Sequence, residues 1–188
     1  MSDLEIRAAS VGAANKKLVG YVVRWNSDSE VIWNEFIEMF SPGAFTDALN
    51  SGDDIRALFE HDHRGLLGRT TSGTLKLEED ATGLRFEIDP PDTSLGRDLL
   101  VSVERGDITG MSFGFRAKEE SWNFDTEPAR RTVIKADLSE ITVTSIPAYK
   151  ESDVSIALRS MAAAQNKDKP VPGDELRRRY LELEEASL

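Results

Sequence analysis

Three residue types in this sequence have the chemistry of acyl transfer. Ser112 lies in GMSFGFR, residues 110–116, which fits the Gly-x-Ser-x-Gly pattern of many serine hydrolases. A serine hydroxyl becomes a good nucleophile when an imidazole removes its proton, and a carboxylate that orients the imidazole helps further. The chain has two histidines, His61 and His63, both in the segment HDH. An imidazole base for Ser112 must therefore come from that segment.

The chain order disfavours an α/β-hydrolase. In that fold the serine occupies a turn between a strand and a helix, and the histidine follows it in the sequence. Here both histidines precede the serine, and GMSFGFR has the alternation of a strand. The alternation predicts two faces: Met111, Phe113 and Phe115 toward the core, and Ser112, Gly114 and Arg116 on the outer side.

Glu140 is the best acid candidate, in DLSEITVTS. Alternation places it on one face with Thr142 and Thr144, opposite Ile141 and Val143. An ordinary exposed glutamate is an equally simple interpretation of that pattern. Asp137, on the opposite face, is a weaker candidate.

His61 raises a conflict of faces. In an uninterrupted strand IRALFEH it would share the face of Ala57 and Phe59 and point into the core. A strand end or bulge at Glu60 would remove the conflict. A metal-dependent hydrolase that uses His61 and His63 is an alternative, but His-x-His alone supplies too few ligands for a catalytic zinc site.

Strand patterns outnumber helical ones along the chain. The section TLKLEEDATGLRFEI predicts a β-hairpin, and TSLGRDLLVSVERGD predicts a helix capped by Thr93 or Ser94 and ended by Gly106. A short helix is expected in SPGAFTDALN, with Ser41 as N-cap and Pro42 in its first turn. Further strands are predicted in these ranges: 18–26, 55–60, 110–120 and 132–146. The expected fold is mainly β with flanking helices (α+β), in the form of an open or closed barrel of mainly antiparallel strands.

Three segments are expected: a flexible N-terminus over 1–17, one domain over 18–159, and a linker with a charged helical tail over 160–188. The net charge of −11 argues against a nucleic-acid partner, because such binding relies on clustered Lys and Arg. No segment resembles a membrane span or a secretory signal, so we expect an intracellular protein. The absence of cysteine excludes disulfides and thiolate metal sites.

Several motifs in order resemble the prohead maturation proteases of tailed bacteriophages, over roughly residues 18–158. They are SPGAF, ALFEHD followed by LLGR, LKLEEDATGLRFEI, RGDITGMSFGF and LSEITVTSIPAY. This family is related to the herpesvirus protease assemblin, so the resemblance implies an assemblin-like β-barrel surrounded by short helices. It also implies a serine endopeptidase without a cofactor.

The resemblance further implies a place of action and a site. Such a protease works in the host cytoplasm inside the immature capsid, or prohead, as a homo-oligomer of two or more copies. It cuts scaffold segments from the major capsid protein and cuts itself. The family's motifs place the nucleophile at Ser112, the general base at His61 and the acid that orients it at Glu140, with Thr142 where a serine often stands. His63 receives no role.

Two questions stay open at this level. The donor that stabilises the oxyanion is not identified, although Arg116, Arg130 and Arg131 are candidates. A capsid-assembly or scaffold protein of the same fold without peptidase activity is the principal alternative. The helix in the tail after residue 160 is interpreted first as a solvated tail or an oligomer contact, and a targeting or self-cleaved segment is the alternative hypothesis.

Overall fold

The computed structural model describes residues 5–14, 16–32, 34–145, 161 and 163–165. Its strands are β1 (Glu5–Ala14), β2 (Lys17–Arg24), β3 (Phe36–Phe40), β4 (Arg56–Phe59), β5 (Asp62–Arg69), β6 (Leu75–Glu79), β7 (Gly83–Ile88), β8 (Gly110–Asn123) and β9 (Ala129–Thr144). Its helices are α1 (Thr46–Asn50), α2 (Ser94–Arg105) and the short 3₁₀ turn η1 (Thr70–Ser72). The prediction of a mainly β protein with a few short helices is confirmed.

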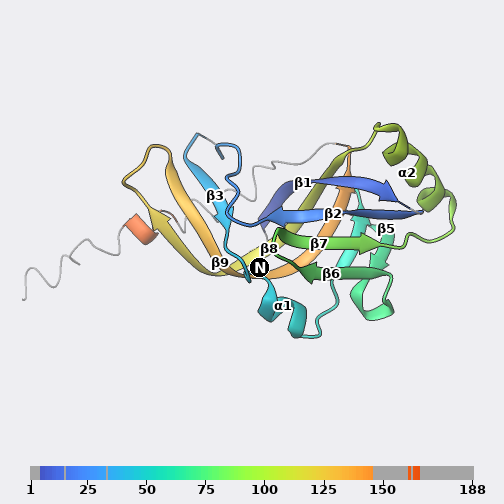
Figure 1. The fold of residues 1–188 in the computed structure, drawn as a ribbon, viewed down its shortest axis with the longest axis horizontal. Helices are drawn as coiled ribbons and strands as arrows, with labels where there is room; N and C mark the ends of the chain where they lie inside the picture. Colours follow the sequence, from blue (N-terminus) through green and yellow to red (C-terminus); the bar gives the residue numbers. More distant parts are fainter. Residues whose placement is uncertain (1–4, 15, 33, 146–160, 162, 166–188) are drawn as a thin grey trace, which may run out of the picture.

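The strands pair in the order β5-β4-β9-β8-β1-β2-β7-β6, and β3 pairs with β9 outside this path (Figure 1). Most neighbours are antiparallel, but β3 and β4 both run parallel to β9. Among the described strands no pairing joins β5 to β6, so the path of hydrogen bonds has two open ends. Closure into a barrel therefore remains a prediction.

The N-terminal segment includes a strand. Within the range 1–17, for which we expected a flexible N-terminus, β1 lies between β2 and β8, and Ala8 pairs with Ser112. The neighbouring strands supply its backbone hydrogen bonds although its sequence has no sustained periodicity. Most of the predicted linker and tail over 160–188 lies outside the described residues.

Local signals explain the confirmed elements. Helix α2 begins after Thr93, whose hydroxyl accepts a hydrogen bond from the N–H of Gly96 at 3.3 Å, and ends at Gly106 in the left-handed conformation. The predicted hairpin is present as β6 and β7. Helix α1, however, begins at Thr46 and not near Ser41, because Gly43 has a φ of 83° that interrupts any helix started at Pro42.

The buried apolar residues form two separate clusters. The larger one packs the central sheet against the helices and includes Met111, Phe113 and Phe115 from β8. The smaller one contains Ile32, Phe36 and Ala129. It lies in an arm formed by β3, the end of β8 and the start of β9, which extends to one side of the body in Figure 1. Strands β8 and β9 thus connect the arm with the body.

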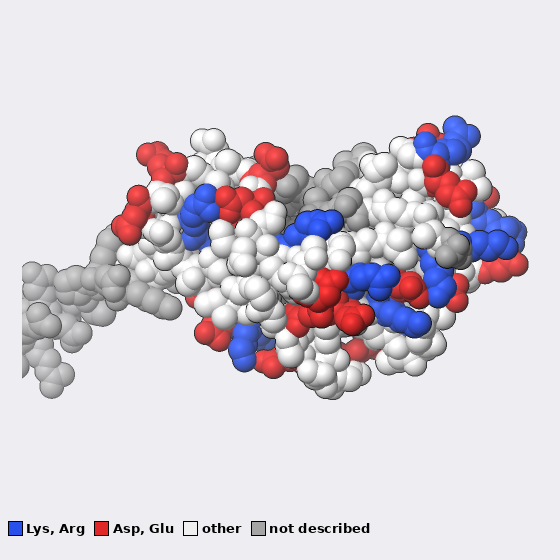
Figure 2. Space-filling model, viewed as in Figure 1, with Lys and Arg blue, Asp and Glu red and all other residues white. Residues whose placement is uncertain are grey.

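The surface carries both signs of charge. Figure 2 shows acidic and basic side chains close to one another on the face in view, without a single large basic area. Several form ion pairs, including Lys17 with Glu87 at 2.7 Å and Lys135 with Asp47 at 2.9 Å. Of the helices that the structure describes, none has the length and apolar character to cross a membrane.

Candidate active site

The alternation predicted for β8 is confirmed, but the exposure of Ser112 is not. Met111 and Phe113 belong to the large apolar cluster, and Ser112 faces the other way, directly opposite Thr142 of β9. We expected an outer face open to solvent. Ser112 and Thr142 are both 0% exposed, and Leu58 of β4, paired with Thr142, is equally buried. The face that carries Ser112 is thus a second buried layer.

Strand β9 presents a row of polar side chains on that layer. Glu140, Thr142 and Thr144 alternate with Ile141 and Val143, which enter the apolar cluster. All three polar residues are at most 9% exposed. In register with Gly114, Ser112 and Gly110 of β8 respectively, they run beside the serine. The predicted face of Glu140 is therefore correct, whereas its interpretation as an exposed glutamate is wrong.

The turn between β4 and β5 resolves the conflict over His61. Phe59 pairs with Asp62, so Glu60 and His61 form a two-residue hairpin loop. Their φ angles are 52° and 56°, as in a type I′ turn. This left-handed pair ends strand β4 at Phe59 and releases His61 from the alternation that would point it into the core.

Gly65 allows the chain to pack closely behind this turn. A Cβ atom at this position would lie 3.1 Å from the carbonyl oxygen of Phe59 and 3.3 Å from that of Asp62. Both distances are shorter than ordinary contacts of a side chain. The glycine of the segment HDHRG thus permits the close return of β5 along β4.

His61 reaches across to β9 and pairs with Glu140. Its Nδ1 lies 2.7 Å from Oε1 of Glu140, and the histidine side chain is only 16% exposed. An ionised carboxylate only accepts hydrogen bonds, so Nδ1 carries the proton and donates it to Glu140. In a neutral imidazole this leaves the lone pair on Nε2, the atom that a general base uses.

Two buried polar atoms lie without a hydrogen-bond partner among the described residues: Nε2 of His61 and Oγ1 of Thr142. An unsatisfied buried polar atom costs roughly 1–3 kcal/mol, so proteins rarely retain one without a reason. Both atoms belong to the layer of Ser112, because Thr142 faces the serine and His61 is fixed to Glu140 on the same strand. The arrangement leaves an unpartnered imidazole nitrogen, among the described residues, on a histidine bound to the strand that pairs with Ser112.

A second carboxylate holds the other end of the turn, and sequence reasoning missed it. Glu60 accepts hydrogen bonds from the hydroxyl of Thr144, the backbone N–H of Ser145 and the hydroxyl of Ser145, each at 2.8 Å. Burial alone would raise the pKa of Glu60, but these donors lower it below its ordinary value. The sequence contained no local signal for these contacts, because 84 and 85 positions separate the partners.

Other predicted residues lie elsewhere. Asp137 forms an exposed ion pair with Lys118 at 2.7 Å. Arg130 and Arg131 are in the arm, roughly 35 Å along an extended strand from Thr142 at about 3.3 Å per residue, so neither is placed to stabilise an oxyanion at Ser112.

Arg116 stays a candidate for that role on β8. It is half-buried and pairs in register with Asp137, beyond an irregularity between Gly114 and Phe115. The extra residue at that irregularity is on β9, so the alternation of β8 continues, and Arg116 follows the core residue Phe115 on the opposite face.

His63 is exposed on β5. Within the described part of the chain no three histidine, aspartate or glutamate side chains cluster in a way that would bind a metal ion. The metal-dependent alternative therefore finds no support in the donor set around HDH.

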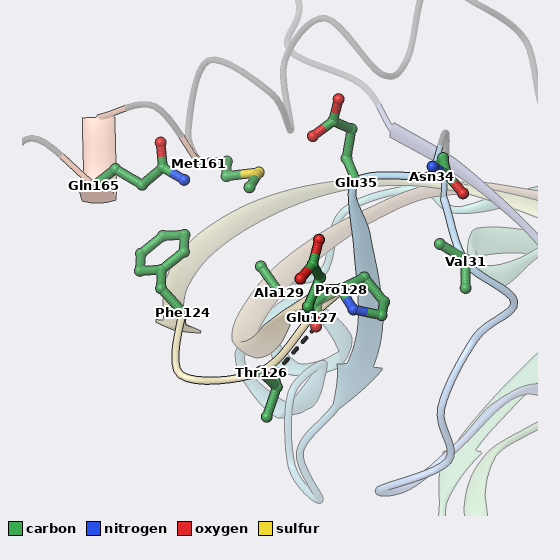
Figure 3. A pocket seen from close by; sticks show the side chains of 10 residues that line it. All are labelled: Val31, Asn34, Glu35, Phe124, Thr126, Glu127, Pro128, Ala129, Met161 and Gln165. Atoms are coloured by element: carbon green, nitrogen blue, oxygen red, sulfur yellow. Dashed lines mark hydrogen bonds between the residues drawn. The ribbon is translucent and has the colours of Figure 1, made fainter.

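A cavity of about 460 Å³ lies in the arm, away from the serine layer (Figure 3). Phe124 and Pro128 line it from the loop between β8 and β9, and Val31 and Glu35 line it from the segment before β3. Met161, in the described part of the C-terminal segment, contributes a side chain as well. None of Ser112, His61 and Glu140 lines this cavity.

The structure thus combines a His61–Glu140 pair with a serine on the strand next to Glu140, on a mainly β fold. The family model described as caudovirus prohead serine protease matches residues 2–167. The chain therefore belongs to the caudovirus prohead serine proteases, as the resemblance implied. No curated protein and no solved structure matches the chain.

Proposed function

We propose that this chain is the maturation endopeptidase of a phage prohead, with Ser112 as nucleophile, His61 as general base and Glu140 as the acid that orients His61. The observation that supports it best is the 2.7 Å contact between Nδ1 of His61 and Glu140, with Nε2 left buried and unpartnered among the described residues. Family membership supports the reaction class.

The proposed reaction is acyl transfer in two steps. Oγ of Ser112 attacks the scissile carbonyl carbon while its proton moves to Nε2 of His61. The C–N bond then breaks, and the amine leaves with the proton from Nε2. A water molecule next attacks the acyl-serine ester with His61 again as base, which releases the acid and restores Ser112. Glu140 accepts from Nδ1 throughout and stabilises the imidazolium.

Access to the serine is part of the proposal. Ser112 is 0% exposed, so a peptide must displace the chain that covers this layer before attack can occur. A protease that must not act before the prohead has assembled benefits from such a covered resting state. We propose the scaffold segment of the major capsid protein, and the chain itself, as substrates, and a homo-oligomer as the active form.

Mass spectrometry of cleavage products tests the function. The parent and Ser112→Ala are each incubated alone and with the major capsid protein of the same virus, and every new terminus is identified. We expect cuts in the parent samples and none with folded Ser112→Ala. Ser121→Ala is the matched control, because Ser121 is an exposed serine on the same strand. Cuts that persist in Ser112→Ala would refute the nucleophile.

The non-catalytic alternative makes the opposite prediction. A capsid-assembly protein of this fold would bind the capsid protein equally well with Ser112→Ala and would leave it intact in the parent sample. A folded parent that makes no cut in itself or in the capsid protein would therefore favour this alternative.

A further inference from the structure

The turn that carries His61 is attached to β9 at two places. His61 bonds to Glu140, and the neighbouring Glu60 bonds to Thr144 and Ser145. The backbone N–H of Glu60 also donates to the carbonyl of Val143 at 3.0 Å, which extends the parallel pairing of β4 with β9 by one residue. The turn is therefore held at Glu140 through His61 and at residues 143–145 through Glu60.

These two attachments bracket the position of the serine. Along β9, Glu140 and Thr144 stand two residues on either side of Thr142, the residue opposite Ser112. Glu60 binds Thr144 at one end of this row, and His61 binds Glu140 at the other end. A rotation of the turn about either attachment would carry the imidazole along the row and change its position relative to Ser112.

We propose that Glu60 is a positioning residue for His61: by binding Thr144 and Ser145 it fixes the left-handed turn so that the imidazole stays over the layer of Ser112. This inference rests on the proposed function. A glutamate at φ 52° needs stabilising contacts, because a non-glycine residue rarely adopts this conformation. The three hydrogen bonds of the carboxylate supply them.

Positioning by Glu60 depends on its ionised carboxylate, which acts as a hydrogen-bond acceptor. All three contacts of Glu60 come from donors, and an ionised carboxylate accepts all of them. In Glu60→Gln the amide oxygen can still accept from Ser145 and the NH2 group can donate to the hydroxyl oxygen of Thr144, but the negative charge that strengthens these hydrogen bonds is lost. The glutamine variant should therefore restore part of what alanine loses.

The test uses the full chain and diisopropyl fluorophosphate as the probe. This reagent forms a bond between Oγ of an activated serine and phosphorus, fluoride leaves, and the serine proton passes to the base. The rate of its addition to Ser112 is followed by mass spectrometry for the parent, Glu60→Ala and Glu60→Gln. Glu78→Ala is the control, an exposed glutamate on β6. In parallel, NMR follows the Nδ1 proton of His61, which the bond to Glu140 shifts downfield.

We expect Glu60→Ala to react about tenfold more slowly or worse, because small displacements of a catalytic group have large effects on rate. Glu60→Gln should be intermediate and Glu78→Ala unchanged. The Nδ1 proton signal should weaken or disappear in Glu60→Ala. If Glu60→Ala reacts at the parent rate and keeps this signal, the proposal is wrong.

Two further cases have their own experiments: a Glu60→Ala variant that does not fold, and a parent that is not labelled. If Glu60→Ala does not fold, Ser145→Ala removes one donor at an exposed position, and we expect a reduction of about threefold; no reduction would refute the proposal. If the parent itself is not labelled at Ser112, the serine is either covered, as proposed above, or inactive, and the cleavage experiment with the capsid protein distinguishes the two; the NMR signal then decides about Glu60 alone. Its loss in Glu60→Ala then supports the positioning role, and its persistence refutes it.

Discussion

The arm and the serine layer both contain ionisable side chains that bind residues of β9 or belong to it. The two regions differ in how fully those side chains are hydrogen-bonded. In the arm, Arg131 is 1% exposed and donates to Glu38 at 2.7 Å and to Glu120 at 2.8 Å, with Trp122 beside its guanidinium. In the serine layer, His61 uses one ring nitrogen on Glu140 and leaves the other unpartnered among the described residues.

This difference in hydrogen bonding suggests a structural role for Arg131 in the arm and a chemical role for His61 in the serine layer. A buried arginine with carboxylates on several of its nitrogens has little capacity left for a ligand, so it holds β3, β8 and β9 together. His61 Nε2 and the Thr142 hydroxyl, which have no partner among the residues that the structure describes, keep capacity for a further hydrogen bond, at a cost in stability. Mutations in the two regions should therefore affect different properties.

The largest expected effect is on activity, at Glu140. In Glu140→Gln the amide can donate to Nδ1, which favours the proton on Nε2 and removes the base. We expect cleavage to fall on the order of 10³- to 10⁴-fold while the melting temperature changes little. Cleavage of the capsid protein and thermal unfolding are measured on the same samples. A melting temperature that collapses together with activity would make Glu140 a structural residue like Glu38.

The converse is expected in the arm. Arg131→Met leaves the carboxylates of Glu38 and Glu120 without their cation, and breaking a buried pair costs about 3–5 kcal/mol. Urea unfolding measures this loss. Below the unfolding transition the folded fraction should retain the parent's rate of cleavage. Arg130→Met, which breaks the exposed ion pair with Asp28, is the control and should cost far less, because solvent screens this pair.

Thr142 offers a smaller effect of opposite sign. Thr142→Val replaces a buried hydroxyl that has no partner among the described residues by a methyl group of similar size. We expect stability to increase by about 1 kcal/mol, because a desolvated polar group is removed. Thr132→Val, at a partly buried site on the same strand, should gain less. A loss of stability in Thr142→Val would show that the hydroxyl is satisfied in solution.

The smallest expected effect is on the thermal stability of the protein at low pH. Burial opposes the shift, but the donors on Ser145 and Thr144 hold the pKa of Glu60 below its ordinary value of 4.5. A group with a lowered pKa in the folded state stabilises above its unfolded pKa, and this contribution is lost as the pH falls through the folded value. Thermal unfolding between about pH 6 and pH 3 should therefore fall less steeply for Glu60→Gln than for the parent. Equal slopes would contradict the shift.

Much of the fold follows from local patterns. Alternation in β8 and β9 predicted which residues enter the core, and the cap and stop signals of α2 were read correctly. Two other features of the fold do not follow from local patterns. The N-terminal segment forms β1 because the neighbouring strands supply its hydrogen bonds, and α1 starts late because Gly43 takes a left-handed conformation.

For the site, the sequence by itself determined the candidates: one serine on the non-core face of a strand, a histidine at a strand end and a glutamate on a polar row. Only the tertiary structure decided that they belong together. The contact between His61 and Glu140 spans 79 positions and depends on the parallel pairing of β4 with β9. It also depends on two non-glycine residues held at positive φ. Local propensity disfavours that conformation, so contacts from distant residues such as Thr144 must impose it.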